Sequence, residues 1–135
     1  MVRGSCLCGD VRYEVTGEAE EMHNCHCSRC RKAHGAAFST FMQIAKTDLR
    51  LVSGEQGLRH FQSSPPVRRS FCGRCGSSLF FEFSALPDAI WVAVGTLDED
   101  PRMRPGAHIF VKSKAPWHNI TDDLPRFDEY PPQAE

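Results

Sequence analysis

Short stretches in which apolar and polar residues alternate recur along most of the chain. In the first, residues 10–16, three apolar side chains alternate with charged ones. Successive side chains of a strand point to opposite faces, so this pattern predicts a strand with one buried face. Gly, Pro, Ser and Asp separate the other strand-like segments, which are 37–44, 49–52, 58–62, 67–71, 78–83, 90–94 and 107–111. Many short strands joined by turns predict a mainly β fold with antiparallel sheets.

One short helix is expected over residues 28–34, because Gly35 follows it and glycine commonly ends a helix. Proline disfavours further helices in the last third, since seven of the nine prolines lie from Pro87 onward. The chain shows no repeat of fixed period, and segment 63–66 is long enough only to turn it. We therefore predict a single domain over residues 1–135.

The composition is that of an ordinary globular domain. Of the 135 residues, 41% are hydrophobic and 24% are charged, and the formal net charge is -1. This charge gives no electrostatic reason to expect nucleic acid as a partner. No apolar stretch has the length of a secretory signal or a membrane span. We expect a soluble, cytoplasmic protein, and the pattern specifies no oligomeric state.

All seven cysteines fall into three tight groups, which are Cys6 with Cys8, Cys25 with Cys27 and Cys30, and Cys72 with Cys75. An odd number cannot pair completely within one chain, and cytosolic thiols stay reduced, so metal ligation is favoured over disulfides. The spacing matches neither ferredoxin pattern, whereas two distant pairs are typical of zinc ribbons. We expect two zinc ions per chain. The first and last pairs would supply the four thiolates of a closed, structural site.

The middle group, named the cysteine triplet (Cys25, Cys27 and Cys30), offers only three ligands. Structural zinc normally has four protein ligands, whereas catalytic zinc keeps one position for water or substrate. The triplet is therefore the candidate catalytic site. The alternative is a second structural site that a histidine completes. Three histidines lie near enough in sequence, His23, His26 and His34.

Three thiolates on a divalent zinc leave a net negative charge, so the site is a poor Lewis acid. It suits the binding of a substrate thiol as a thiolate better than it suits hydrolysis. Zinc deaminases also use cysteine-rich ligation, but their His-x-Glu signature is absent. Six cations are candidates to balance the charge, Arg29, Arg31, Lys32, Arg68, Arg69 and Arg74. Each of them, taken singly, is more typical of a solvated surface charge.

Aromatic residues gather in the second half of the chain. Because β-rich domains bury such residues, we assign most of them to the core, namely Phe80, Phe81, Phe83, Trp91 and Phe110. Trp117 and His118 follow a proline in the irregular tail and are the pair expected to line a pocket. His60 and His108 have no partner visible in the sequence.

Three motifs together resemble the glutathione-dependent formaldehyde-activating enzyme family. They are residues 4–13 (GSCLCGDVRY), 25–32 (CHCSRCRK) and 71–77 (FCGRCGS). The later segments 95–98 (GTLD), 108–111 (HIFV) and 116–117 (PW) are also similar to that family. The likeness therefore covers nearly the whole chain.

The resemblance implies an Mss4-like fold, in which antiparallel sheets pack around zinc sites. By motif, Cys6, Cys8, Cys72 and Cys75 would hold structural zinc, and the triplet would hold the working zinc. The resemblance also implies a carbon–sulfur lyase that acts on glutathione plus formaldehyde, through S-hydroxymethylglutathione, or on a related thiol–aldehyde adduct. A small thiol and an aldehyde are then the expected partners, and His26 or water would supply the proton for the new hydroxyl.

Two functions of other classes compete with catalysis. The Mss4-like fold also occurs in proteins that bind small GTPases, so a zinc-stapled binding module is one alternative. A ribbon that binds nucleic acid is the other. A second metal ion that responds to glutathione would favour the enzyme over both.

Overall fold

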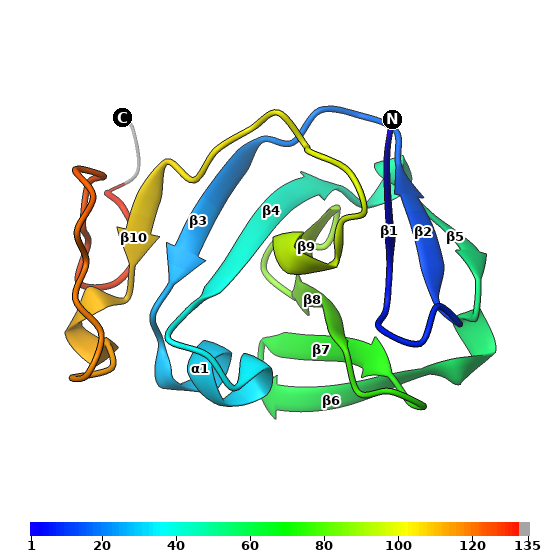
Figure 1. The fold of residues 1–135 in the computed structure, drawn as a ribbon, viewed down its shortest axis with the longest axis horizontal. Coiled ribbons are helices and arrows are strands. Elements are labelled where there is room, and N and C mark those ends of the chain that lie inside the picture. Colours follow the sequence, from blue (N-terminus) through cyan, green and yellow to red (C-terminus); the bar gives the residue numbers. More distant parts are fainter. Residues whose placement is uncertain (133–135) are drawn as a thin grey trace.

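The structure, a computed structural model, describes residues 1–132, so residues 133–135 of the expected domain lie outside the described part. Within it, ten strands form two sheets, and one α-helix, α1 (Ser28–His34), connects β3 to β4 (Figure 1). The smaller sheet has the order β1-β2-β5, with bounds β1 (Val2–Ser5), β2 (Arg12–Val15) and β5 (Leu49–Ser53). The larger sheet has the order β10-β3-β4-β9-β8-β7-β6. Its strands are β3 (Glu21–Cys25), β4 (Ser39–Ala45), β6 (Leu58–Ser64), β7 (Val67–Cys72), β8 (Ser78–Phe83), β9 (Ala89–Ala93) and β10 (Ala107–Ile109).

The predicted mainly β fold with one short helix is confirmed, and α1 has the predicted bounds. The pairing is antiparallel except between β10 and β3, which are parallel. Two strands were not predicted, β1 and β3. β1 has only four residues, one of them glycine, and the buried positions of β3 carry Met, Asn and Cys rather than β-branched or aromatic residues. No helix in the described part is long and apolar enough to cross a membrane.

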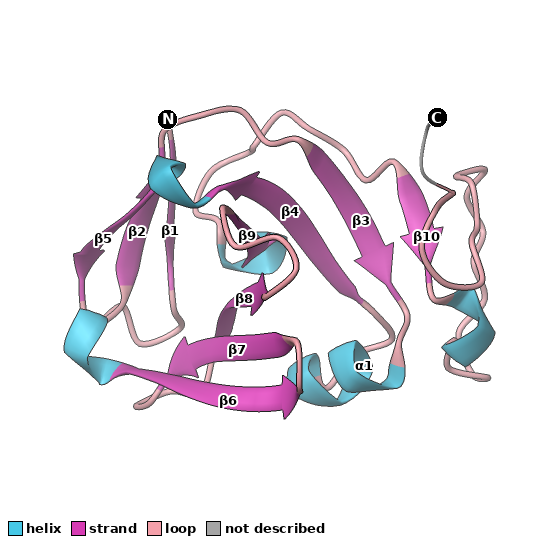
Figure 2. Cartoon of the chain, turned by 180° about the vertical axis from the view of Figure 1, so that it is seen from behind, coloured by secondary structure: helices cyan, strands magenta, loops and turns pink. Residues whose placement is uncertain are grey.

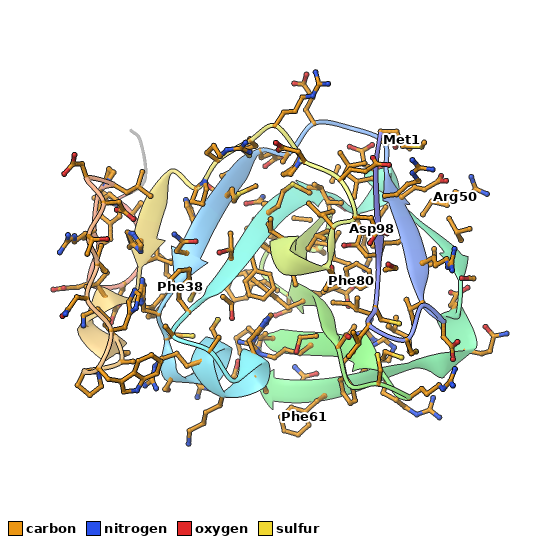
Figure 3. All side chains as sticks on the ribbon, viewed as in Figure 1. Met1, Phe38, Arg50, Phe61, Phe80 and Asp98 are labelled. Atoms are coloured by element: carbon orange, nitrogen blue, oxygen red, sulfur yellow. The ribbon has the colours of Figure 1, made fainter. Side chains whose placement is uncertain are left out.

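The main core lies between the two sheets. Alternate residues of β4 and β9 point into it, and Phe80 of β8 lies in this interior in Figure 3, whereas Phe61 of β6 points outward. The smaller sheet contributes Tyr13, whose ring lies against Gly4. A Cβ atom on Gly4 would stand 2.1 Å from the Tyr13 ring, so this strand position requires glycine. The Tyr13 hydroxyl hydrogen-bonds to Thr96 at 2.6 Å.

The opposite face of the larger sheet carries a second, smaller cluster. It includes Phe41, with Phe81 and Trp91 packed against it. The chain after β10 runs alongside this strand as an irregular tail, seen at the left of Figure 1, and is fixed there by backbone hydrogen bonds such as His108 N–H to the Pro125 carbonyl at 2.9 Å. Helix α1 lies beside the ends of β6 and β7 in the reverse view (Figure 2). Both the helix and the tail therefore border the same face of the sheet.

Short 3-10 helices follow four of the strands, β4, β5, β9 and β10. They are η1 (Lys46–Asp48), η2 (Glu55–Gly57), η3 (Val94–Thr96) and η4 (Val111–Ser113). Gly54, immediately before η2, has φ +80, a left-handed conformation that glycine adopts without strain.

Candidate metal centre and substrate cavity

Two turns that are distant in sequence bring four sulfur atoms together. Cys6 and Cys8 lie in the turn after β1, Cys72 ends β7, and Cys75 lies in the turn that follows. Their four Sγ atoms lie within 4.8 Å of one another. The backbone N–H groups of Arg74 and Cys75 point at the Cys72 sulfur, at 3.4 and 3.5 Å. The predicted joining of the two pairs is therefore present in the fold.

The spacing of these sulfurs fits a metal ion. Zinc–sulfur bonds of about 2.3 Å in a tetrahedron place neighbouring sulfurs about 3.8 Å apart. The Cys8 and Cys72 sulfurs are 3.8 Å apart, and the Cys6 and Cys8 sulfurs are 3.6 Å apart. This four-thiolate cluster could hold one metal ion without rearrangement.

The cysteine triplet is assembled by local structure. Cys25 is the last residue of β3, Cys27 is the N-cap of α1, and Cys30 lies in the first turn of that helix. The Cys27 sulfur accepts a hydrogen bond from the Cys30 N–H at 3.2 Å, and the Cys30 thiol donates to the Cys25 sulfur at 3.3 Å. All three Sγ atoms lie within 4.8 Å of one another. The triplet could therefore hold a second ion.

Within residues 1–132, no histidine nitrogen or carboxylate oxygen joins the three sulfurs at that distance. The three candidate histidines have other surroundings. His26 is fully buried and hydrogen-bonds to His108, His34 packs edge-on against Phe41 at 5.2 Å, and His23 lines a cavity. The described part of the chain thus offers this site three sulfur ligands.

The three thiols of the triplet differ in acidity. Hydrogen bonds from Cys25 and Cys30 hold the pKa of Cys27 far below its ordinary range, and nearby Arg69 acts in the same direction, although burial opposes both. Hydrogen bonding to Cys27 and Cys30, together with burial, raises the pKa of Cys25. The lowered pKa favours the thiolate form of Cys27. Such a charged thiolate is the form that binds metal.

Of the six cations considered above, Arg69 is the one that hydrogen-bonds to a triplet sulfur in the described chain. Its Nη2 atom is 3.6 Å from the Cys30 sulfur, and its Nε atom donates to Ser63 at 3.1 Å. The guanidinium carbon also lies 5.8 Å from the centre of the Phe81 ring. Arg69 therefore connects the triplet to the aromatic residues beside it.

The other cations have different roles. Arg68 pairs with Glu82, and Arg74 pairs with Asp10 at 3.1 Å. Arg29 lines the cavity described next.

A cavity of about 760 Å³ opens beside the triplet, whose three cysteines form part of its wall. Most of the remaining wall is apolar, with aromatic rings from Phe41, Phe81, Phe83, Trp91, Phe110 and Tyr130. The assignment to the core holds for Phe81, Trp91 and Phe110 in the second, smaller cluster, where they also line this cavity, whereas Phe83 lines the cavity and belongs to neither cluster. Phe80 alone of the five predicted core aromatics is in the main core. The strand period of two explains the division, because Phe81 points to the opposite face from Phe80.

The expectation that Trp117 and His118 line a pocket is not met at this cavity, whose wall contains neither residue. Trp117 is 70% exposed. The His118 ring packs against Phe38 at 5.5 Å.

A chain of hydrogen bonds through the buried rings of His26 and His108 supports the turn that carries the triplet. His26 Nε2 is 2.8 Å from His108 Nδ1, and His108 Nε2 is 2.9 Å from an Asp122 oxygen. The backbone N–H of His26 also donates to the Ile109 carbonyl at 2.9 Å. Burial lowers the pKa of His26 to about 4, so its ring is neutral at neutral pH. His26 holds the turn between Cys25 and Cys27 and does not line the cavity, so of the two expected proton sources this position favours water.

The fold and its two sulfur clusters define a cysteine-rich β domain that could hold metal ions at two sites. The family model described as glutathione-dependent formaldehyde-activating enzyme matches residues 1–113. The chain therefore belongs to this family, and the resemblance inferred from the cysteine motifs is confirmed.

Individual relatives agree with this assignment. A protein of Halomonas elongata named "Putative glutathione-dependent formaldehyde-activating enzyme" is 29% identical over 127 residues, which cover 89% of this chain and 81% of that protein. An uncharacterized lyase of Schizosaccharomyces pombe is 31% identical over 60% of this chain, a match that spans 57% of that protein. The crystal structure of a Rhodobacter sphaeroides protein is similar with a TM-score of 0.61 and 29% identity, over 74% of this chain and 92% of that one. The names of these relatives support an enzyme.

Proposed function

We propose that this protein is a zinc-dependent carbon–sulfur lyase that makes and breaks the adduct of a thiol with a small aldehyde. Glutathione and formaldehyde are the substrates that the family name suggests. The observation that carries the proposal is the triplet, where three sulfurs without a fourth described ligand face a cavity large enough for a substrate. Zinc bound there would lower the pKa of a substrate thiol that takes its remaining position.

In the reaction, the thiolate sulfur attacks the carbonyl carbon and a carbon–sulfur bond forms. The π electrons of the carbonyl move to its oxygen, which takes up one proton from water to become a hydroxyl. The thiol has already lost one proton, so the balance is a transfer from sulfur to oxygen, and the reverse sequence releases both substrates. Neither direction needs an oxidant or a reductant.

Residues of the chain have three tasks in this scheme. The triplet holds the metal, Arg69 places positive charge beside the sulfurs, and the aromatic wall excludes water from the reacting atoms. Because uncatalysed thiols already react with formaldehyde, positioning the two reactants supplies most of the acceleration that is needed. None of the four cysteines of the other cluster lines the cavity beside the triplet, and that cluster is proposed to be structural.

Cobalt substitution tests the proposal. Glutathione should change the visible absorption of the cobalt at the triplet, and Cys27→Ser should remove that response. Exchange of formaldehyde between free and glutathione-bound forms, followed by NMR, should be faster with the zinc-loaded protein than without it. A spectrum that ignores glutathione, together with an unchanged exchange rate, would refute the proposal and favour a binding module.

A further inference from the structure

Three aromatic rings form an apolar cluster that lines the cavity, called here the aromatic platform (Phe41, Phe81 and Trp91). The Phe81 and Trp91 rings are stacked, with centroids 4.8 Å apart and planes at 5°. Phe41 meets Phe81 edge-on at 4.6 Å and 87°. The three residues come from the neighbouring strands β4, β8 and β9, and Phe81 is directly opposite Trp91 in the sheet register.

Packing of the main core does not explain this platform. The core lies on the other face of the sheet, and both Phe81 and Trp91 remain partly exposed in the cavity. A cluster of aromatic rings in the wall of a concave site can bind another aromatic ring by edge-to-face or offset-stacked contact. The platform therefore has the geometry of a binding surface.

Formaldehyde is far too small to use it. The cavity measures about 760 Å³, whereas one water molecule takes up about 30 Å³ of the liquid and formaldehyde has only one more heavy atom. Glutathione does not match the platform either, because its amides, carboxylates and ammonium group would lose water against apolar rings. A ligand that fills the cavity well must carry an apolar, flat group.

Two arginines, Arg29 and Arg69, line the cavity together with the triplet, whereas the polar side chains of Glu21, His23 and Gln43 line it along β3 and β4. Arg69 contacts both the Cys30 sulfur and the Phe81 ring, so the platform lies next to the triplet. Within residues 1–132, neither Arg29 nor Arg69 has a carboxylate within 4.0 Å, which leaves both guanidinium groups able to meet an anion. The carboxylates of a peptide-like thiol suit this end of the cavity.

We propose that the preferred substrate is the adduct of such a thiol with an aromatic aldehyde, whose ring lies on the aromatic platform. This inference rests on the proposed function, since it places the substrate sulfur at the triplet. In the adduct, the ring is attached to the carbon that forms the carbon–sulfur bond, so ring and sulfur stay close together. Phe41 and Phe81 pack in the same cluster as Cys25 and Cys30, which meets this requirement.

The end of the chain completes the enclosure. Tyr130, Pro131 and Pro132 line the cavity, and the Tyr130 ring meets Phe110 at 4.9 Å. These residues lie beyond the part that the family model matches. The apolar enclosure thus depends on a segment that the family match does not cover, and the preference for an aromatic ring is proposed for this chain in particular.

Binding of two stable thioethers tests the inference without turnover. S-benzylglutathione carries a ring on the carbon bonded to sulfur, and S-methylglutathione is its matched control. We expect the benzyl compound to bind at least about tenfold more tightly, because it buries a phenyl group against stacked rings. In a Trp117→Phe background, Trp91 is the sole tryptophan, and its fluorescence should change with the benzyl compound only.

Substitutions in the platform test whether its rings cause the preference for the benzyl compound. Trp91→Leu and Phe81→Leu, each checked for folding by circular dichroism, should reduce the preference measured by calorimetry to about twofold or less. Phe61→Leu, which removes an exposed ring outside the cavity, should leave the preference intact. Equal affinity for the two thioethers, or a full preference in both folded platform variants, would overturn the inference.

The outcome separates this inference from the proposed function. Faster exchange of formaldehyde with glutathione, but no preference for the benzyl compound, would refute the platform and leave the reaction standing. A clear benzyl preference without any exchange activity, for formaldehyde or benzaldehyde, would refute the reaction. The platform would then remain as a binding surface for aromatic thioethers.

Discussion

Replacing one cysteine in each sulfur cluster should have unequal effects on stability, and the chain separations give the size of the difference. Cys8 and Cys72 contact each other across 64 positions, whereas Cys25 and Cys30 are 5 positions apart. A bond that closes a longer loop removes more entropy from the unfolded chain. By the loop-closure relation, a link across the longer loop stabilises by about 4 kcal/mol and one across the shorter loop by about 2 kcal/mol.

The local setting of each cysteine adds to the difference. Cys72 is 1% exposed, so a serine there places a hydroxyl in the core. Cys27 is the N-cap of α1, a position that serine fills well, so Cys27→Ser keeps the helix cap. We therefore expect Cys72→Ser to be less stable than Cys27→Ser by at least about 2 kcal/mol, which is about 8 °C in unfolding midpoint for a chain of this length.

The assay is thermal unfolding of zinc-loaded wild type and both variants, followed by circular dichroism, with metal content measured by mass spectrometry. Each variant should hold one zinc fewer than the wild type. The metal-free wild type is the control for effects of the substitution alone. Midpoints that agree within about 2 °C, or a reversed order, would refute the division into a structural and a working site.

Three further predictions concern the fold itself. Leu79→Ala removes a fully buried side chain, so the free energy of unfolding in urea should fall by about 2–5 kcal/mol, and a loss under 1 kcal/mol would contradict the packing. Gly54→Ala should lower it by about 1–3 kcal/mol, because Gly54 has φ +80 and a Cβ atom would stand 2.2 Å from a backbone oxygen. Burial opposes ionisation of Glu82, but hydrogen bonds from Lys46 and Arg68 outweigh it, so the pKa of Glu82 lies below its ordinary value. The stability these contacts add is present at neutral pH and is lost as the pH falls below about 4, so Glu82→Gln should melt below wild type at pH 7 and together with it at pH 3, and a constant gap would contradict this.

The elements of the fold that were predicted correctly follow from patterns within short segments of the sequence. The segments of β6, β7 and β8 were predicted as strands because turn residues separate them, and Gly35 ends α1 in the left-handed conformation expected of a helix-terminating glycine. The parallel pairing of β10 with β3 could not be predicted, since it joins segments about 80 residues apart and depends on which sheet edge is free.

The candidate site, like the fold, could be predicted only in part. The triplet follows from spacing, because Cys25 to Cys30 fold as one strand end and one helix start. The cavity does not, since Phe80 and Phe81 are adjacent in sequence and only the position of the smaller sheet decides which of them faces the core. The hydrogen bond between His26 and His108 spans 82 positions and left no local signal at all. The sequence holds one hint of this division. β8 has apolar residues at positions that point to both faces of the sheet, which is typical of a strand covered on both sides.

The long separation between the halves of the four-thiolate cluster also matters while the chain is being made. A ribosome that adds about 5–20 residues per second needs about 3–13 s to progress from Cys8 to Cys72, 64 positions later. During that time the first two thiols have no partners, whereas Cys25, Cys27 and Cys30 emerge almost together. If the nascent polypeptide meets oxidant or a competing metal in this interval, Cys6 and Cys8 are exposed to it for longer than the triplet is.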